Sequence, residues 1–127
     1  MHQALPVRSI ALVVEPDQEQ RALVATLLEE SDLQVIECDS AEAALVVVDL
    51  KIAHMAMVVT DVALAGRIDG VTLAQNLEAQ HPEVPVIVMS ARPSERVNEL
   101  PDNVHQLACP WRPLDMLIVA ERARRAA

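Results

Sequence analysis

The chain has 127 residues, of which 52% are hydrophobic, so it is long enough to form one domain around a sizeable core. That core has to be aliphatic, because the chain contains no Phe, no Tyr and only one Trp. The formal net charge is −9, and an acidic protein repels phosphate backbones, which argues against direct binding of nucleic acid. No apolar run reaches the ~20 residues of a membrane helix, and the N-terminus lacks a signal pattern, so a cytoplasmic protein is expected.

The first half of the chain alternates between predicted strands and predicted helices. Residues 9–14 form a nearly continuous apolar run, which is typical of a buried parallel strand. Asp17 is then expected to cap a helix, with Gln20 completing a capping box three residues later. A second strand is predicted at 33–38, followed by a helix that Ser40 caps. The valines in that helix are poor helix formers, but their position between two strands favours a helix.

The second half continues the same alternation. The third predicted strand, 57–60, ends at Asp61, and a loop leads to a helix at about 71–80. The predicted ranges that follow are a strand at 84–90, a short fourth helix from Pro93 or Ser94 to near Pro101, a strand at 104–108, and a last helix at 114–125 with Pro113 in its first turn.

Five such repeats predict an α/β fold with three layers, in which helices cover both faces of a parallel sheet. In sheets of this kind, the functional site lies at the carboxyl ends of the strands, where the strand order reverses. The polar or chemically reactive residues at those ends are Glu15, Asp61, Ser90 and Cys109.

Four segments at these strand ends carry a resemblance to a known family. They read "ALVVEPDQEQR", "MVVTDVALAGRIDG", "VPVIVMSA" and "LACPWRP". In this order and spacing the chain resembles the receiver domains of two-component response regulators, in an atypical single-domain form. The resemblance covers about residues 8–125. It implies a single flavodoxin-like domain over 1–127, with strand order 2-1-3-4-5 and no output domain.

The resemblance also implies roles for individual residues. Asp61 would be the phosphoacceptor, whose carboxylate forms an acyl phosphate. Mg²⁺ would neutralise the charges that meet there, held by Glu15, Asp61 and the backbone carbonyl of Ala63. Ser90 would be the switch hydroxyl, and the small Ala91 would leave access to it.

Each of the three polar side chains also has a purely structural interpretation. Asp61 could cap a turn, and Glu15 could stabilise the start of the next helix through the helix dipole. For Ser90, a plain turn hydroxyl is as good an interpretation as a switch. The register of the four segments favours the functional interpretation of Asp61.

Three positions depart from the family pattern. Pro16 stands where the family has a second acid, so Mg²⁺ would be held more weakly, and Asp17 is expected to point elsewhere. Gln106 replaces the switch aromatic, and Cys109 replaces a lysine that pairs with the acceptor and the phosphoryl group. The only lysine of the chain is Lys51, and nothing in the sequence shows that Arg92 or Arg112 substitutes for the missing cation.

Cys109 has two interpretations of its own. One is a redox-sensitive thiol, and the favoured one is a small buried filler, since free Cys often behaves as a small hydrophobe. A disulfide with Cys38 is not expected, because the two would end opposite edge strands. The Cys109–Pro110 peptide is expected to be cis, as in the family.

The functional hypothesis is a receiver that takes a phosphoryl group from a histidine kinase or a histidine phosphotransfer protein. It would signal to a downstream protein through the fourth helix, the fifth strand and the last helix. The alternative is a phosphorylation-independent pseudo-receiver that acts as a constitutive interaction module. An enzyme such as a phosphatase is disfavoured, because Ala63 stands where a second acid would be needed; at most the protein would catalyse its own phosphorylation and dephosphorylation. The sequence leaves a homodimer open.

Overall fold

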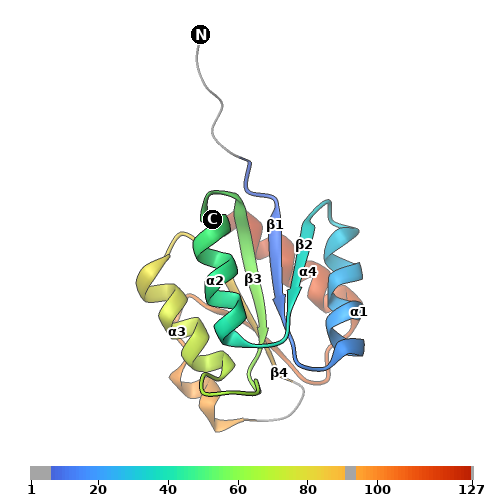
Figure 1. Ribbon diagram of the computed structural model, residues 1–127. Coiled ribbons are helices and arrows are strands. Elements are labelled where there is room, and N and C mark those ends of the chain that lie inside the picture. The colour runs from blue at the N-terminus through green and yellow to red at the C-terminus, as the bar shows by residue number, and fades with distance from the viewer. Residues whose placement is uncertain (1–6, 91–93, 127) are drawn as a thin grey trace.

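The computed structural model describes residues 7–90 and 94–126, and these form a five-stranded parallel sheet between two layers of helices (Figure 1). The strands are β1 (Ile10–Val14), β2 (Gln34–Cys38), β3 (Met55–Asp61), β4 (Val86–Ser90) and β5 (His105–Ala108). Their order in the sheet is β2-β1-β3-β4-β5, and all neighbours pair in parallel. The predicted three-layer α/β fold and its strand order are confirmed.

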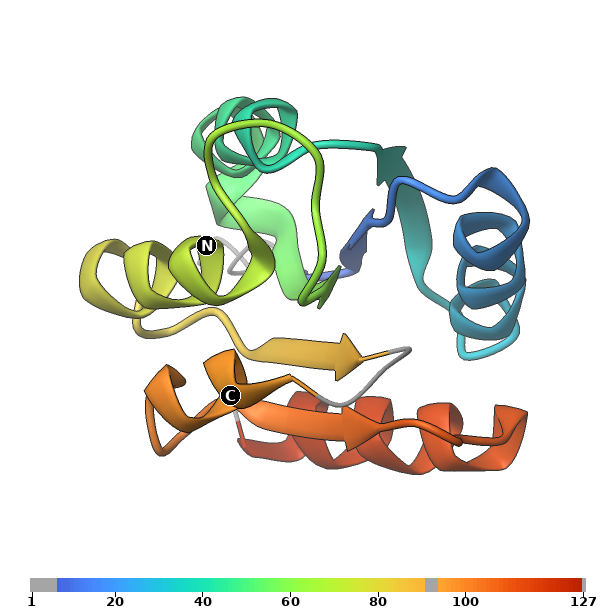
Figure 2. The ribbon, with the colours of Figure 1, turned by 90° about the horizontal axis from the view of Figure 1, so that it is seen from below.

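The helices divide between the two faces of this sheet. The α-helices are α1 (Gln18–Glu29), α2 (Ala41–Lys51), α3 (Gly70–Gln80) and α4 (Pro113–Ala126), and the 3₁₀ helices are η1 (Ile52–His54) and η2 (Glu95–Glu99). Viewed from below, α1 and α4 lie on one side of the sheet, and α2 and α3 lie on the other (Figure 2). None of the helices in the described ranges is long and apolar enough to cross a membrane.

Alternation along the central strands divides the core in two. In β1, Leu12 and Val14 face α2 and α3, whereas Ala11 and Val13 face α1 and α4. All residues of β1 and β3 are buried, as expected for parallel strands that are covered on both faces. The core is aliphatic as predicted, with methionines among its largest fully buried side chains.

Short polar side chains begin three of the α-helices. Asp17 accepts a hydrogen bond from Glu19 N, Ser40 from Ala43 N and Asp69 from Thr72 N. The predicted capping box at α1 is wrong, because the Asp17 backbone N–H donates to Glu15 Oε1 (3.1 Å) in place of Gln20. The valine run does lie within α2, where Val48 is buried against the sheet.

The short fourth helix that was predicted to end near Pro101 is present, as the 3₁₀ helix η2. Ser94 caps η2, and Pro101 lies two residues after its end, so the segment has room for little more than one helical turn. Residues 91–93, including Pro93 as an alternative helix start, lie outside the described residues. One consequence is that Gln106 and Ala108 of β5 remain exposed.

Candidate functional site

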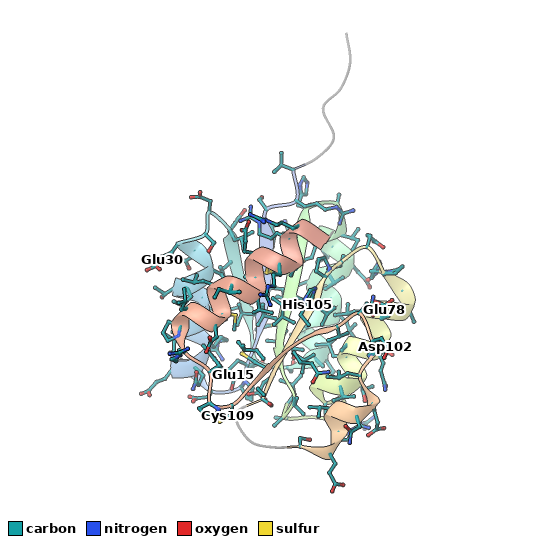
Figure 3. All side chains as sticks on the ribbon, turned by 180° about the vertical axis from the view of Figure 1, so that it is seen from behind. Glu15, Glu30, Glu78, Asp102, His105 and Cys109 are labelled. Carbon is teal, nitrogen blue, oxygen red and sulfur yellow. The ribbon has the colours of Figure 1, made fainter. Side chains whose placement is uncertain are left out.

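The carboxyl ends of β1 and β3 meet the loop after β5 at a cavity of about 450 Å³. Figure 3 shows two of its residues, Glu15 and Cys109, at this end of the sheet. The lining residues are Glu15, Asp17, Gln20, Leu23, Asp61, Met89, Cys109, Pro110, Trp111 and Pro113. The cavity therefore combines an acidic part with an apolar part formed by α1 and the β5–α4 loop.

Asp61 is the last residue of β3, and only 8% of it is exposed. Its Oδ1 accepts a hydrogen bond from Ala63 N (2.8 Å), which fixes the orientation of the carboxylate. The Thr60 hydroxyl donates to the Asp61 carbonyl oxygen (3.0 Å), and Val62 N donates to Met89 O (3.0 Å). These bonds fix both the backbone and the side chain of Asp61 at the end of the strand.

Gly70, the first residue of α3, packs directly against the backbone of Asp61. A Cβ atom at this position would lie 1.8 Å from the Asp61 carbonyl oxygen, and Gly70 N donates to Val62 O (2.9 Å). The start of α3 and the end of β3 therefore pack so closely that no side chain fits between them.

Gly70→Ala is expected to lower the free energy of unfolding by about 3 kcal/mol, because the backbone has to move to admit the methyl group. Gly66→Ala is the matched control. Gly66 has φ 101°, but the nearest atoms to its Cβ belong to the flexible Glu42 side chain, so a loss of only about 1 kcal/mol is expected. Urea unfolding of both variants measures the difference, and equal losses would contradict the close packing at Gly70.

Glu15 follows β1 directly and is even more buried, with 4% exposed. Its Oε1 accepts the bond from Asp17 N already described. Burial raises the pKa of Glu15 to about 8, and hydrogen bonding with Asp61 and repulsion from its charge add to this effect. Near neutral pH and without a metal, the raised pKa of Glu15 therefore favours its protonated form.

The two carboxylates fit the ligand preference of Mg²⁺, which takes hard oxygen ligands and needs only one or two carboxylates besides water. No three His, Cys, Asp or Glu side chains of residues 7–90 and 94–126 come close enough to hold a metal. Water and a backbone oxygen such as that of Ala63 would have to complete the coordination. The absence of a third side-chain ligand agrees with Pro16, which is exposed and has no ligating atom in its side chain.

Asp17 was missed as a member of the site. We expected it to point elsewhere, but it lines the same cavity as Glu15 and Asp61 while its carboxylate accepts from Glu19 N (3.2 Å). The sequence feature that could have indicated this is the spacing of two residues between Glu15 and Asp17. The same spacing brings the Asp17 N–H to the Glu15 carboxylate.

Cys109 is exposed, so the favoured interpretation of a small buried filler is wrong. It follows β5, which is an edge strand, and therefore lies beyond the covered part of the sheet. Both cysteines are free, as expected, and burial raises the pKa of the Cys38 thiol to about 11. The Cys109–Pro110 peptide is cis, as predicted.

No Lys or Arg side chain of the described ranges lines the cavity. Lys51 ends α2 near the start of β3, at the other end of the sheet. Arg112 is largely exposed and lies near Asp115 (3.6 Å), and Arg21 binds Glu37 (3.2 Å) and the Glu15 carbonyl oxygen (2.8 Å). Arg92 lies outside the described residues. The loss of the lysine at position 109 is therefore uncompensated within the described part of the chain.

Ser90 and Gln106 line a second, smaller cavity of about 210 Å³ between β4, β5 and η2. Its other lining residues are Val88, Ser94, Val97, Leu107 and Ala108. The expected switch hydroxyl thus lines the same cavity as Gln106 and is not among the residues that line the Asp61 cavity. Ala91 lies outside the described residues.

Comparison with known proteins agrees with this architecture. The chain superimposes on a response regulator receiver domain protein from Clostridium thermocellum with a TM-score of 0.83 at 16% identity, covering 93% of this chain and 95% of the other. The signal receiver domain of an HD domain-containing protein from Pseudomonas fluorescens Pf-5 gives 0.84 at 19% identity, covering 94% and 96%. The receiver domain of NtrX from Brucella abortus gives 0.80 at 26% identity, covering 92% and 99%.

No curated protein sequence matches the chain. The family model of the response regulator receiver domain matches residues 11–100, which span β1 to η2 and include Glu15, Asp61 and Ser90. This match covers most of the chain, and the strand order and the similar structures agree with it. The protein belongs to the response regulator receiver domain family.

Proposed function

We propose that this receiver domain accepts a phosphoryl group on Asp61 with the help of Mg²⁺ and passes the signal on by protein contact. The observation that carries the proposal is the pair of buried carboxylates, Glu15 and Asp61, at one cavity where β1 and β3 end. Burying two acids side by side is unfavourable unless a cation or a proton joins them. A site of this kind is suited to binding a divalent cation together with a phosphoryl group.

In the proposed reaction, an Asp61 carboxylate oxygen attacks the phosphorus atom of a phosphohistidine. The P–N bond breaks, the imidazole nitrogen keeps the electron pair, and an acyl phosphate forms on Asp61. The Ala63 N–H holds Oδ1, which orients the carboxylate for attack. Bound Mg²⁺, held by Glu15, Asp61 and the Ala63 carbonyl, would supply positive charge for the phosphoryl oxygens. Glu15 has to lose its proton for this role, since a metal ligand is a carboxylate.

The proposed partners follow from membership of the family. A histidine kinase or a histidine phosphotransfer protein would be the donor, and a downstream protein would bind the surface formed by η2, β5 and α4. The cytoplasm is the proposed location. The net charge of −9 opposes nucleic-acid binding.

The second candidate function is a constitutive interaction module that does not turn over phosphate. Two observations favour it. No Lys or Arg of the described residues lines the Asp61 cavity, and Ser90 lines a different cavity together with Gln106. The first feature removes a contact to the phosphoryl group that the family resemblance implies, and in the second Ser90 does not line the cavity where its own contact is expected.

Incubation with a small phosphodonor and Mg²⁺ is expected to add one phosphoryl group to the protein, because Asp61 and Glu15 are both present at the cavity. Intact-protein mass spectrometry measures the adduct. Asp61→Asn has nearly the same shape without the nucleophilic carboxylate and is expected to stay unmodified, and chelation of Mg²⁺ is expected to abolish the adduct.

The same experiment with a phosphorylated histidine phosphotransfer protein as donor separates the two candidate functions. An adduct with either donor supports the receiver function. No adduct with both donors would sink the proposal in favour of the constitutive module.

A further inference from the structure

The 3₁₀ helix η2 is joined to the start of α3 by one side chain, Arg96. Its Nε donates to Asp69 Oδ2 (3.0 Å), and its Nη2 donates to Asp69 Oδ1 (3.2 Å) and to Thr72 Oγ1 (3.2 Å). The contact to Asp69 is therefore bidentate, which is the strong and directional form of an Arg–carboxylate pair. The guanidinium holds the pKa of Asp69 below its usual range.

Asp69 is not an ordinary surface acid. It is the N-cap of α3, and its Oδ1 accepts a hydrogen bond from Thr72 N (2.8 Å). Arg96 therefore binds both the capping carboxylate and the hydroxyl of the residue that is capped. In this way a residue of η2 fixes the first turn of α3.

The first turn of α3 in turn touches the acceptor. Gly70 follows Asp69 and packs against the Asp61 carbonyl without room for a Cβ atom, and its N–H binds Val62 O. The short loop from Val62 to Asp69 contains Ala63, whose N–H orients the Asp61 carboxylate. We call residues 62–69 the acceptor loop. A displacement of the α3 cap would therefore move both ends of this loop.

The other end of the connection, η2, lies close to Ser90, the expected switch hydroxyl at the end of β4. η2 comes shortly after Ser90, the last residue of β4, and Val97 of η2 lines the cavity that contains Ser90. A second bond, from Gln75 Nε2 to Glu99 O (2.8 Å), also holds η2 against α3. The segment after β4 and the loop after β3 are thus joined through the cap of α3.

We propose that Arg96 is a positioning residue for the acceptor site: it holds Asp69, and through the α3 cap it sets the geometry of Ala63 and Asp61. The proposal deepens the proposed function and rests on it only where Mg²⁺ is concerned. The loss of Arg96 is expected to leave the loop 62–69 less ordered and so to weaken Mg²⁺ binding at the site, because binding then has to order the loop. Arg96 does not line the Asp61 cavity, so its effect has to pass through Asp69 and Gly70.

Amide hydrogen exchange without metal tests the connection itself. In Arg96→Gln, the exchange of the Ala63 and Gly70 amides is expected to be at least threefold faster than in the wild type. Arg125→Gln is the matched control, because it removes a guanidinium from another salt bridge (Nε to Glu121 Oε1, 2.9 Å) on α4. If only Thr72 and η2 exchange faster while Ala63 and Gly70 do not change, Arg96 merely supports the cap and the proposal is overturned.

Mg²⁺ titration tests the consequence for the site. Trp111 lines the cavity and is the only Trp in a chain without Tyr or Phe, so its fluorescence reports binding there. The dissociation constant for Mg²⁺ is expected to rise at least threefold in Arg96→Gln and to stay unchanged in Arg125→Gln. Arg96→Lys keeps the charge without the bidentate geometry and is expected to recover part of the loss.

A double variant shows whether the effect passes through Asp69. Asp69→Asn keeps an oxygen that can cap α3 but loses the ion pair with Arg96. The double variant Arg96→Gln/Asp69→Asn is therefore expected to bind Mg²⁺ no more weakly than whichever single variant binds it more weakly. Additive losses would overturn the proposed route. Should Arg96→Gln fail to fold, Arg96→Lys serves in the same comparisons.

The two readouts separate this proposal from the proposed function. If the wild type gives no Mg²⁺ response, the metal step of the proposed function fails, and the exchange of Ala63 and Gly70 alone decides the positioning role. If Mg²⁺ binds equally well to the wild type and to Arg96→Gln, the positioning role is overturned and the proposed function stands.

Discussion

Cys109→Lys is expected to raise the rate of Asp61 phosphorylation by a small phosphodonor about 100-fold. The Asp61 cavity contains three acids, Glu15, Asp17 and Asp61, and no Lys or Arg of the described chain lines it. A thiol is a weak donor without charge, whereas an ammonium group on a flexible stem can reach the oxygens on which negative charge develops. Removal of one such preorganised donor from an enzyme site commonly costs a factor of ~10²–10³, so its addition should recover much of this factor.

Cys109→Gln is the matched control for this experiment, because glutamine is of similar length to lysine but carries no charge. Its rate is expected to stay close to that of the wild type. Cys109 is exposed, so both variants should unfold with free energies within about 0.5 kcal/mol of the wild type. The measurement is the initial rate of adduct formation by intact mass. Equal rates for the Lys and Gln variants would show that a missing cation is not what limits the reaction.

Glu15→Gln is expected to be more stable than the wild type above pH 8. It is also expected to lose most of the pH dependence of the free energy of unfolding that the wild type shows below pH 8. The pKa of Glu15 is raised from 4.5 to about 8, chiefly by burial. Between these two values the folded state keeps a proton that the unfolded state has lost. The wild type therefore loses stability as pH rises through this window, by on the order of 3 kcal/mol, and the loss levels off above about pH 8. Glutamine has no proton to lose and cannot show this trend.

Urea unfolding followed by Trp111 fluorescence, at several pH values between 5 and 9 for both proteins, measures this difference. Mg²⁺ is expected to reverse the trend in the wild type, because the metal binds the folded state with both carboxylates ionised and stabilises it by mass action. The variant should gain little from Mg²⁺. An equal pH slope in the two proteins would mean that another group, and not Glu15, controls the titration.

The sequence was sufficient to predict the sheet and the position of the two acids. Apolar runs that alternate with amphipathic segments specify a parallel sheet, and the residue that ends each run has to lie at the same edge. For Glu15 and Asp61 the strand ends were therefore predictable from neighbouring residues alone. The burial of both side chains was not, since it depends on how α1 and the β5–α4 loop close over them.

Three features could not be predicted, because each depends on contacts outside the local pattern or on the place of the residue in the fold. The 3₁₀ helix η2 is fixed by Arg96 and Asp69, which are 27 residues apart, and no local pattern reveals that contact. Cys109 was expected to be buried because of its residue type, but its position after an edge strand exposes it. The capping box does not form, because the Asp17 N–H donates to the carboxylate of Glu15, which lies outside the helix.

The short length of the fourth helix, η2, has a further consequence for the edge of the sheet. β5 is the terminal strand, and two of its four residues, Gln106 and Ala108, are open to solvent on one face. An uncovered edge strand presents free N–H and C=O groups, on which strands of other molecules can add and start aggregation. Here the strand is only four residues long, and Pro110, which has no N–H to donate, follows soon after it. The short length of β5 and the proline after it therefore limit the stretch over which a strand of another molecule could pair with this edge.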